Sequence, residues 1–115
     1  MSLSKKQQEF TLAIAQLINY ANVRGYSLTF GDAYRDPRVH GEIGQKNSYS
    51  SSKSCHKYRL AVDFNLFAKG NYVADGTNFA YIDIGEEWER IHPLARWGGR
   101  FGDANHFSFE HNGSK

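Results

Sequence analysis

Three side chains that lie apart in the sequence have the types that bind a metal ion: His56, Asp63 and His106. On one continuous strand, the odd spacing of seven residues between His56 and Asp63 would place them on opposite faces. They converge if His56 lies in a loop (SKSCHK) before a strand (LAVDFNLF) that contains Asp63. Two imidazoles and one carboxylate, with a fourth position open, are typical of catalytic zinc. Spacing alone also allows all three to be ordinary loop, surface or core residues.

Two further residues could act on a substrate bound at such a site. Asp103 precedes His106 by three residues, so its carboxylate could reach a water molecule activated by zinc without binding the metal. It is a candidate general base that takes the proton and passes it to the leaving amine. Arg35 is a candidate to stabilise negative charge on the attacked carbonyl oxygen. The alternatives are an ordinary loop aspartate beside Gly102 and a solvated arginine.

The stretch WGGRFGDANHFSF, residues 97–109, holds an unusual number of glycines for a strand-forming segment. Gly98, Gly99 and Gly102 would leave the backbone open to a polymer substrate. The glycine pair could instead mark a bulge. Trp97 is expected either to line the substrate groove or to pack in a small core.

Elements that could position these residues follow from the hydrophobic pattern. The spacing of Phe10, Ile14 and Leu17 predicts an amphipathic helix over 4–24, with Ser4 as its N-cap and a stop at Gly25. Further expected elements are a strand from 26 to about 32, a loop over 36–54, a strand over 59–67, a hairpin partner over 72–74, a helix over 84–91 and a strand over 106–111. These predict one α+β domain over 1–115, with a small antiparallel sheet and helices on one side.

Composition excludes several classes of protein. The 115 residues fit one domain, and a net charge of +2 is too small to indicate a nucleic-acid partner. No apolar run approaches the roughly 20 residues of a membrane span, and the single cysteine excludes an intramolecular disulfide. Polar residues interrupt the apolar N-terminal segment, so no export signal is expected. We expect a monomer that does not insert into membranes.

Two motifs resemble those of the M15 zinc peptidases. SCHKYRLAVDFNLF resembles the Ser-x-His motif that is followed, after six residues, by Asp, and WGGRFGDANHFSF resembles the second motif, Trp-Gly-Gly followed by Asp-x-x-His. The residues in register are Ser54, His56, Asp63, Asp103 and His106. AYRDP resembles the segment that carries the active-site arginine of the family, here Arg35. Arg59 stands where many members have glycine, a feature that the phage-type sequences share.

The resemblance implies an M15, hedgehog-like α+β fold and one Zn²⁺ per chain. The implied ligands are His56, Asp63 and His106, with Asp103 as general base. The residues implied for substrate binding or ligand support are Ser54, Trp97, Gly98 and Gly99. RLAVDFNLF and WGGRF further resemble single-domain phage and prophage endolysins, which cut the L-Ala–D-Glu bond of peptidoglycan and have no wall-binding domain. Such an enzyme would stay in the host cytoplasm until its release to the cell wall.

Three alternatives remain. A D-alanyl-D-alanine carboxypeptidase would use the same ligands and base, with a cation such as Arg38, Lys46 or Lys53 to hold the terminal carboxylate. A cysteine hydrolase would use Cys55 as nucleophile, although this leaves Asp63 without a role. A non-catalytic wall-binding module would not need a general base.

Overall fold

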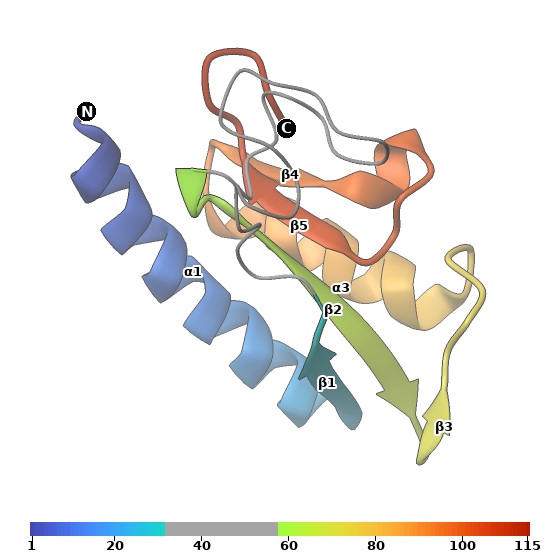
Figure 1. Ribbon diagram of the computed structural model, residues 1–115. Coiled ribbons are helices and arrows are strands. Elements are labelled where there is room, and N and C mark those ends of the chain that lie inside the picture. Colours follow the sequence, from blue (N-terminus) through green and yellow to red (C-terminus); the bar gives the residue numbers. More distant parts are fainter. Residues whose placement is uncertain (32–57) are drawn as a thin grey trace.

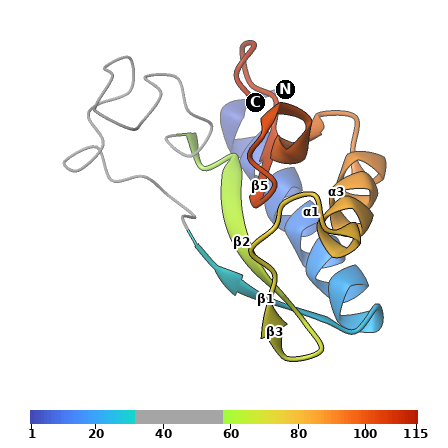
Figure 2. The same cartoon turned by 90° about the vertical axis from the view of Figure 1, so that its right-hand side faces the viewer.

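The computed structural model describes residues 1–31 and 58–115 (Figure 1). The elements are α1 (Leu3–Val23), β1 (Tyr26–Phe30), β2 (Ala61–Ala68), β3 (Asn71–Tyr72), α3 (Phe79–Ile91), β4 (Ala95–Trp97), the 3-10 helix η2 (Gly98–Phe101) and β5 (His106–Phe109). The strands form an antiparallel sheet in the order β1-β2-β5-β4, and β3 pairs with β2. Both helices pack on one face of this sheet (Figure 2). The expected α+β fold is confirmed.

Helix α1 follows the expected pattern to within one residue at each end. Its N-cap is Ser2 rather than Ser4, and the Ser2 hydroxyl accepts a hydrogen bond from the Lys5 backbone N–H at 3.1 Å. After the C-cap, Gly25 adopts a φ of +86°, which turns the chain into β1. The buried residues of α1 are Phe10, Ala13, Leu17 and Ala21. No helix among the described residues is long and apolar enough to cross a bilayer.

The alternation of side chains along β2 and β5 determines which of them point away from α1 and α3. The side chains packed in the core are Val62, Phe64 and Leu66 of β2 and Phe107 and Phe109 of β5. Because successive side chains of a strand point to opposite faces, Asp63 and His106 lie on the face away from the helices. The sheet therefore separates its hydrophobic core from these two polar residues.

Trp88 of α3 ties this helix to the strands that carry the polar face. Its indole N–H lies 3.1 Å from the carbonyl oxygens of both Arg96 and Ser108. Its ring stacks on Phe109 with centroids 5.7 Å apart. The helix thus holds β4 and β5 in register.

The C-terminal half departs from the expected elements. Helix α3 begins at Phe79, five residues before the expected start, because Asn78 caps it by accepting from the Ala80 N–H at 2.9 Å. Strand β4 and helix η2 were not expected, because a three-residue strand followed by Gly-Gly shows too little hydrophobic periodicity to be recognised in the sequence. The last strand ends at Phe109 rather than at residue 111, and β3 covers residues 71–72 rather than 72–74.

Candidate active site

Asp63 and His106 lie directly opposite each other on neighbouring strands. They are register partners in the β2–β5 ladder, and the Phe64 N–H donates to the Asn105 carbonyl oxygen at 2.9 Å. This bond connects the residues flanking the pair, which makes Asp63 and His106 a non-hydrogen-bonded pair, the type in which facing side chains come closest. His106 Nδ1 lies 3.3 Å from Asp63 Oδ1. His106 is buried, with 6% of its surface exposed.

The second ring nitrogen of His106 determines the tautomer of the ring. His106 Nε2 lies 3.1 Å from the backbone oxygen of Lys115. A backbone oxygen only accepts hydrogen bonds, so Nε2 donates to it. His106 Nδ1 then faces the Asp63 carboxylate, and a metal ion held between these two atoms would be stabilised by both.

The pair has the chemistry and the spacing of two zinc ligands. Two atoms bound to one tetrahedral zinc ion at roughly 2.0–2.2 Å lie about 3.3–3.6 Å apart, and the Nδ1–Oδ1 separation of 3.3 Å agrees with this range. Within residues 1–31 and 58–115, no group of three His, Cys, Asp or Glu residues could hold a metal ion. The third expected ligand, His56, lies outside the described residues, so the three-residue zinc site stays a prediction.

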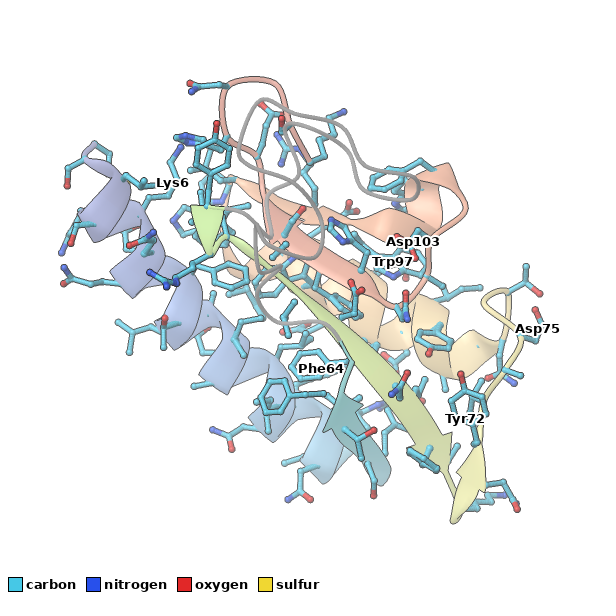
Figure 3. All side chains as sticks on the ribbon, in the orientation of Figure 1. Lys6, Phe64, Tyr72, Asp75, Trp97 and Asp103 are labelled. Atoms are coloured by element: carbon cyan, nitrogen blue, oxygen red, sulfur yellow. The ribbon has the colours of Figure 1, made fainter. Side chains whose placement is uncertain are left out.

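Asp103 lies on the turn that connects η2 to β5 (Figure 3). Its backbone N–H donates to the Gly98 carbonyl oxygen at 2.8 Å, and its carbonyl oxygen accepts from the His106 N–H at 3.1 Å. The turn also requires Gly102, whose φ of +82° favours glycine. The backbone of the exposed Asp103 is therefore held by two hydrogen bonds, one to Gly98 and one to the candidate ligand His106.

A pocket of about 260 Å³ opens beside Asp103. The residues that line it are Tyr72, Ala74, Gly76, Tyr81, Gly102, Asp103, Ala104 and Asn105. None of these described lining residues is a lysine or an arginine. The pocket therefore offers hydroxyl, amide and carboxylate groups to a substrate.

Gly98 and Gly99 were interpreted as clearing space for substrate, and the structure gives them a different reason. A Cβ at Gly98 would collide with the carbonyl oxygen of Asp103 and the Cβ of His106. A Cβ at Gly99 would collide with the Trp97 ring. The protein's own atoms occupy the space into which a side chain at either position would point.

Trp97 is packed beneath this turn, with only 4% of its surface exposed. A Cβ at Gly85 of α3 would also collide with its ring, so the indole lies between α3 and Gly99. Its indole N–H donates to the Ala104 carbonyl oxygen at 2.7 Å. Trp97 thus supports the turn that carries Asp103, and Figure 3 shows the two labelled residues close together.

Several expected site residues lie outside the described part of the chain: Arg35, Ser54, Cys55 and His56. Gly31, directly after β1, lies next to Asp63, because its N–H donates to the Asp63 carbonyl oxygen at 2.7 Å. A Cβ at Gly31 would lie 3.2 Å from Asp63 Cβ, so this approach is close.

Two contacts of His106 were missed by sequence reasoning. Phe101, half exposed, lies edge-on to the His106 ring with centroids 6.0 Å apart. The other is the backbone oxygen of Lys115, and the turn-forming pair Asn112-Gly113 before it is the sequence signal for this contact.

Comparison with known proteins places these residues in a family. The model of a family of M15 peptidases, described as D-alanyl-D-alanine carboxypeptidase, matches residues 48–109, more than half of the chain. This range includes both motifs, from Ser54 to Asp63 and from Trp97 to His106. The chain belongs to this family of peptidases. No curated protein matches the sequence.

Proposed function

We propose that this chain is a zinc-dependent peptidase that cuts the peptide stem of bacterial peptidoglycan. The observation that carries the proposal is the geometry of His106 and Asp63. An imidazole with its hydrogen on Nε2 presents Nδ1 to a carboxylate oxygen 3.3 Å away, on the face of the sheet opposite the core. M15 peptidases are generally zinc-dependent, which agrees with this donor set.

In this proposal Asp63, His106 and, from its motif, His56 hold one zinc ion per chain. The bound zinc supplies Lewis-acid activation of water and of the scissile carbonyl. Asp103 accepts the proton of the attacking water and donates it to the leaving amine. Arg35 stabilises the negative charge that develops on the carbonyl oxygen. Ser54 supports the neighbouring ligand.

The bond that we propose is L-Ala–D-Glu. The resemblance of the motifs to phage endolysins supports an endopeptidase. A carboxypeptidase must hold a free carboxylate, and the cations expected for this task, Arg38, Lys46 and Lys53, lie outside the described residues. The second candidate is a D-alanyl-D-alanine carboxypeptidase, which the description of the matching family favours.

The endolysin resemblance also supports a proposal about where the protein acts. A phage or prophage enzyme of this kind would stay in the host cytoplasm and act on peptidoglycan after release. It would act as a monomer, since one chain contains every residue that the proposed mechanism uses. Neither nucleic acid nor membrane insertion has a part in it.

The experiment that tests the proposed function combines fragment analysis with one substitution. Purified peptidoglycan is digested with the protein, and mass spectrometry of the fragments identifies the bond. New N-terminal D-Glu is expected, whereas released D-Ala would favour the carboxypeptidase. Asp103→Ala should lower the rate by about 100-fold or more while zinc binding persists.

The matched control is Glu86→Ala, which removes an exposed carboxylate on α3 far along the sequence from the proposed residues. Its activity should equal that of the wild-type protein. An Asp103→Ala variant as active as Glu86→Ala would remove Asp103 from its proposed role.

A further inference from the structure

The chain after β5 forms a tight hairpin, residues 111–115, which is called the tail hairpin below. The His111 N–H donates to the Ser114 carbonyl oxygen at 2.8 Å, and the Ser114 N–H donates to the His111 carbonyl oxygen at 2.9 Å. The two residues between them, Asn112 and Gly113, have φ values of +50° and +83°. Positive φ at both positions is the signature of a type I′ turn, which Asn-Gly favours. Figure 1 shows the chain turning back here toward β4 and β5.

The tail hairpin is held on both sides of its base. The Glu110 N–H donates to the Leu94 carbonyl oxygen at 2.8 Å. The centroids of the His111 and Tyr58 rings lie 4.6 Å apart, and His111 Nδ1 lies 2.9 Å from Lys6 Nζ of α1. Burial and the positive charge of Lys6 both lower the pKa of His111, which keeps Nδ1 free to accept from Lys6. These contacts fix the direction in which the hairpin leaves the sheet.

The tail hairpin ends at Lys115, whose backbone oxygen contacts the His106 ring. The turn reverses the direction of the chain and brings this oxygen to 3.1 Å from His106 Nε2. A histidine that binds a metal commonly donates its other ring N–H to a carbonyl or carboxylate, which fixes its tautomer and orientation. His106 has this arrangement, and its acceptor comes from the tail hairpin.

We propose that the tail hairpin is a positioning element for His106. The Lys115 backbone oxygen accepts a hydrogen bond from Nε2 and directs Nδ1 toward Asp63, where a metal ion would bind. The inference rests on the proposed function, because it takes His106 as a metal ligand. It assigns a role to residues 111–115, which lie outside both motifs and outside the matched range of the family.

The turn can be changed without altering either ligand. Gly113→Val places a β-branched residue at a φ of +83°, a backbone conformation that it strongly disfavours, although the site itself is open, with no atom within 4 Å of an added Cβ. Gly25→Val is the matched control, because Gly25 has a φ of +86° and is equally open, but joins α1 to β1. Gly113→Asn is the rescue variant, since asparagine tolerates positive φ.

Two quantities are measured for each variant of the full chain. The first is the tautomer of His106 in metal-free protein, from ring ¹⁵N–¹H correlation spectra. The second is the affinity for Zn²⁺ by competition with a chromogenic chelator. We expect Gly113→Val to lose the uniform Nε2–H tautomer and to bind zinc about 10–100-fold more weakly, the usual effect of removing such a partner. Gly25→Val and Gly113→Asn should match the wild-type protein in both.

The outcomes separate this inference from the proposed function. If Gly113→Val keeps the wild-type tautomer and zinc affinity, the positioning role is wrong and the zinc site stands. If the wild-type protein binds no zinc, the proposed function is wrong and the positioning role fails with it. Should Gly113→Val not fold, Gly113→Ala imposes a milder strain at the same positive φ and is judged by the same two measurements.

Discussion

The chemistry of the candidate site depends on single atoms of two residues. His106 presents Nδ1 to Asp63 because Nε2 is bonded to the Lys115 backbone oxygen, and Asp63 faces His106 because the two are a close pair on adjacent strands. A carboxylate contributes both an oxygen ligand and a negative charge to such a site. Removing the charge while keeping the shape of the side chain therefore tests its role as a ligand.

Asp63→Asn is expected to weaken zinc binding by more than about 100-fold, because loss of a direct ligand should exceed the loss of an outer partner. Isothermal titration with Zn²⁺ measures this change. Asn65→Ala is the control, since Asn65 lies two residues further along β2 and shares its face. Equal affinities in Asp63→Asn and the wild-type protein would exclude Asp63 as a ligand.

At the scale of elements, the site depends on how closely its segments approach one another. In the turn between η2 and β5, Asp103 approaches Gly98 so closely that a side chain at Gly98 would collide with it. Trp97 connects this turn to α3. A second junction lies at the far end of the helices, where the Asp83 carboxylate of α3 accepts hydrogen bonds from Tyr20, Arg24 and Tyr26. These partners come from α1, its C-cap and β1, so one carboxylate connects three elements.

The Asp83 junction predicts acid-sensitive stability. Burial alone would raise the pKa of Asp83, but the hydrogen bonds from Tyr20, Tyr26 and Arg24 and the charge of Arg24 outweigh it and lower the pKa. The folded state therefore binds the proton less readily than the unfolded state does. The stabilisation is complete above the unfolded pKa of about 3.9 and is lost as the pH falls through the folded value.

Asp83→Asn should therefore lower the free energy of unfolding at pH 7 by about 1.5–3 kcal/mol, the range for hydrogen bonds to a charged group. The difference between variant and wild-type protein should shrink as the pH falls below about 4. Urea unfolding at a series of pH values measures both. A constant difference from pH 7 to pH 2 would contradict the account.

At the scale of the whole molecule, much of the fold could be predicted from the sequence. The helix at the N-terminus and the strand around Asp63 have strong periodic patterns, and both were placed to within about two residues. The start of α3 was missed because its cap, Asn78, lies in a polar stretch, residues 75–78, to which no element was assigned. Strand β4 was missed because three residues carry almost no periodic signal.

The sequence predicted candidate residues for the site but not their geometry. Motif spacing singled out Asp63, Asp103 and His106, whose roles stay predictions, whereas the register that sets Asp63 opposite His106 depends on how two distant strands pair. The Lys115 contact uses a backbone oxygen, and any residue at that position would supply one. The role of Gly98 was misinterpreted because a sequence does not show which atoms fill the space beside a glycine.

The most direct test of a zinc peptidase is to measure metal content and peptidoglycan hydrolysis on one purified sample. Both are measured before chelation, after chelation and after Zn²⁺ is restored. The account predicts one zinc ion per chain, hydrolysis that is lost on chelation and hydrolysis that returns with zinc. Hydrolysis that continues at the full rate in metal-depleted protein would contradict it.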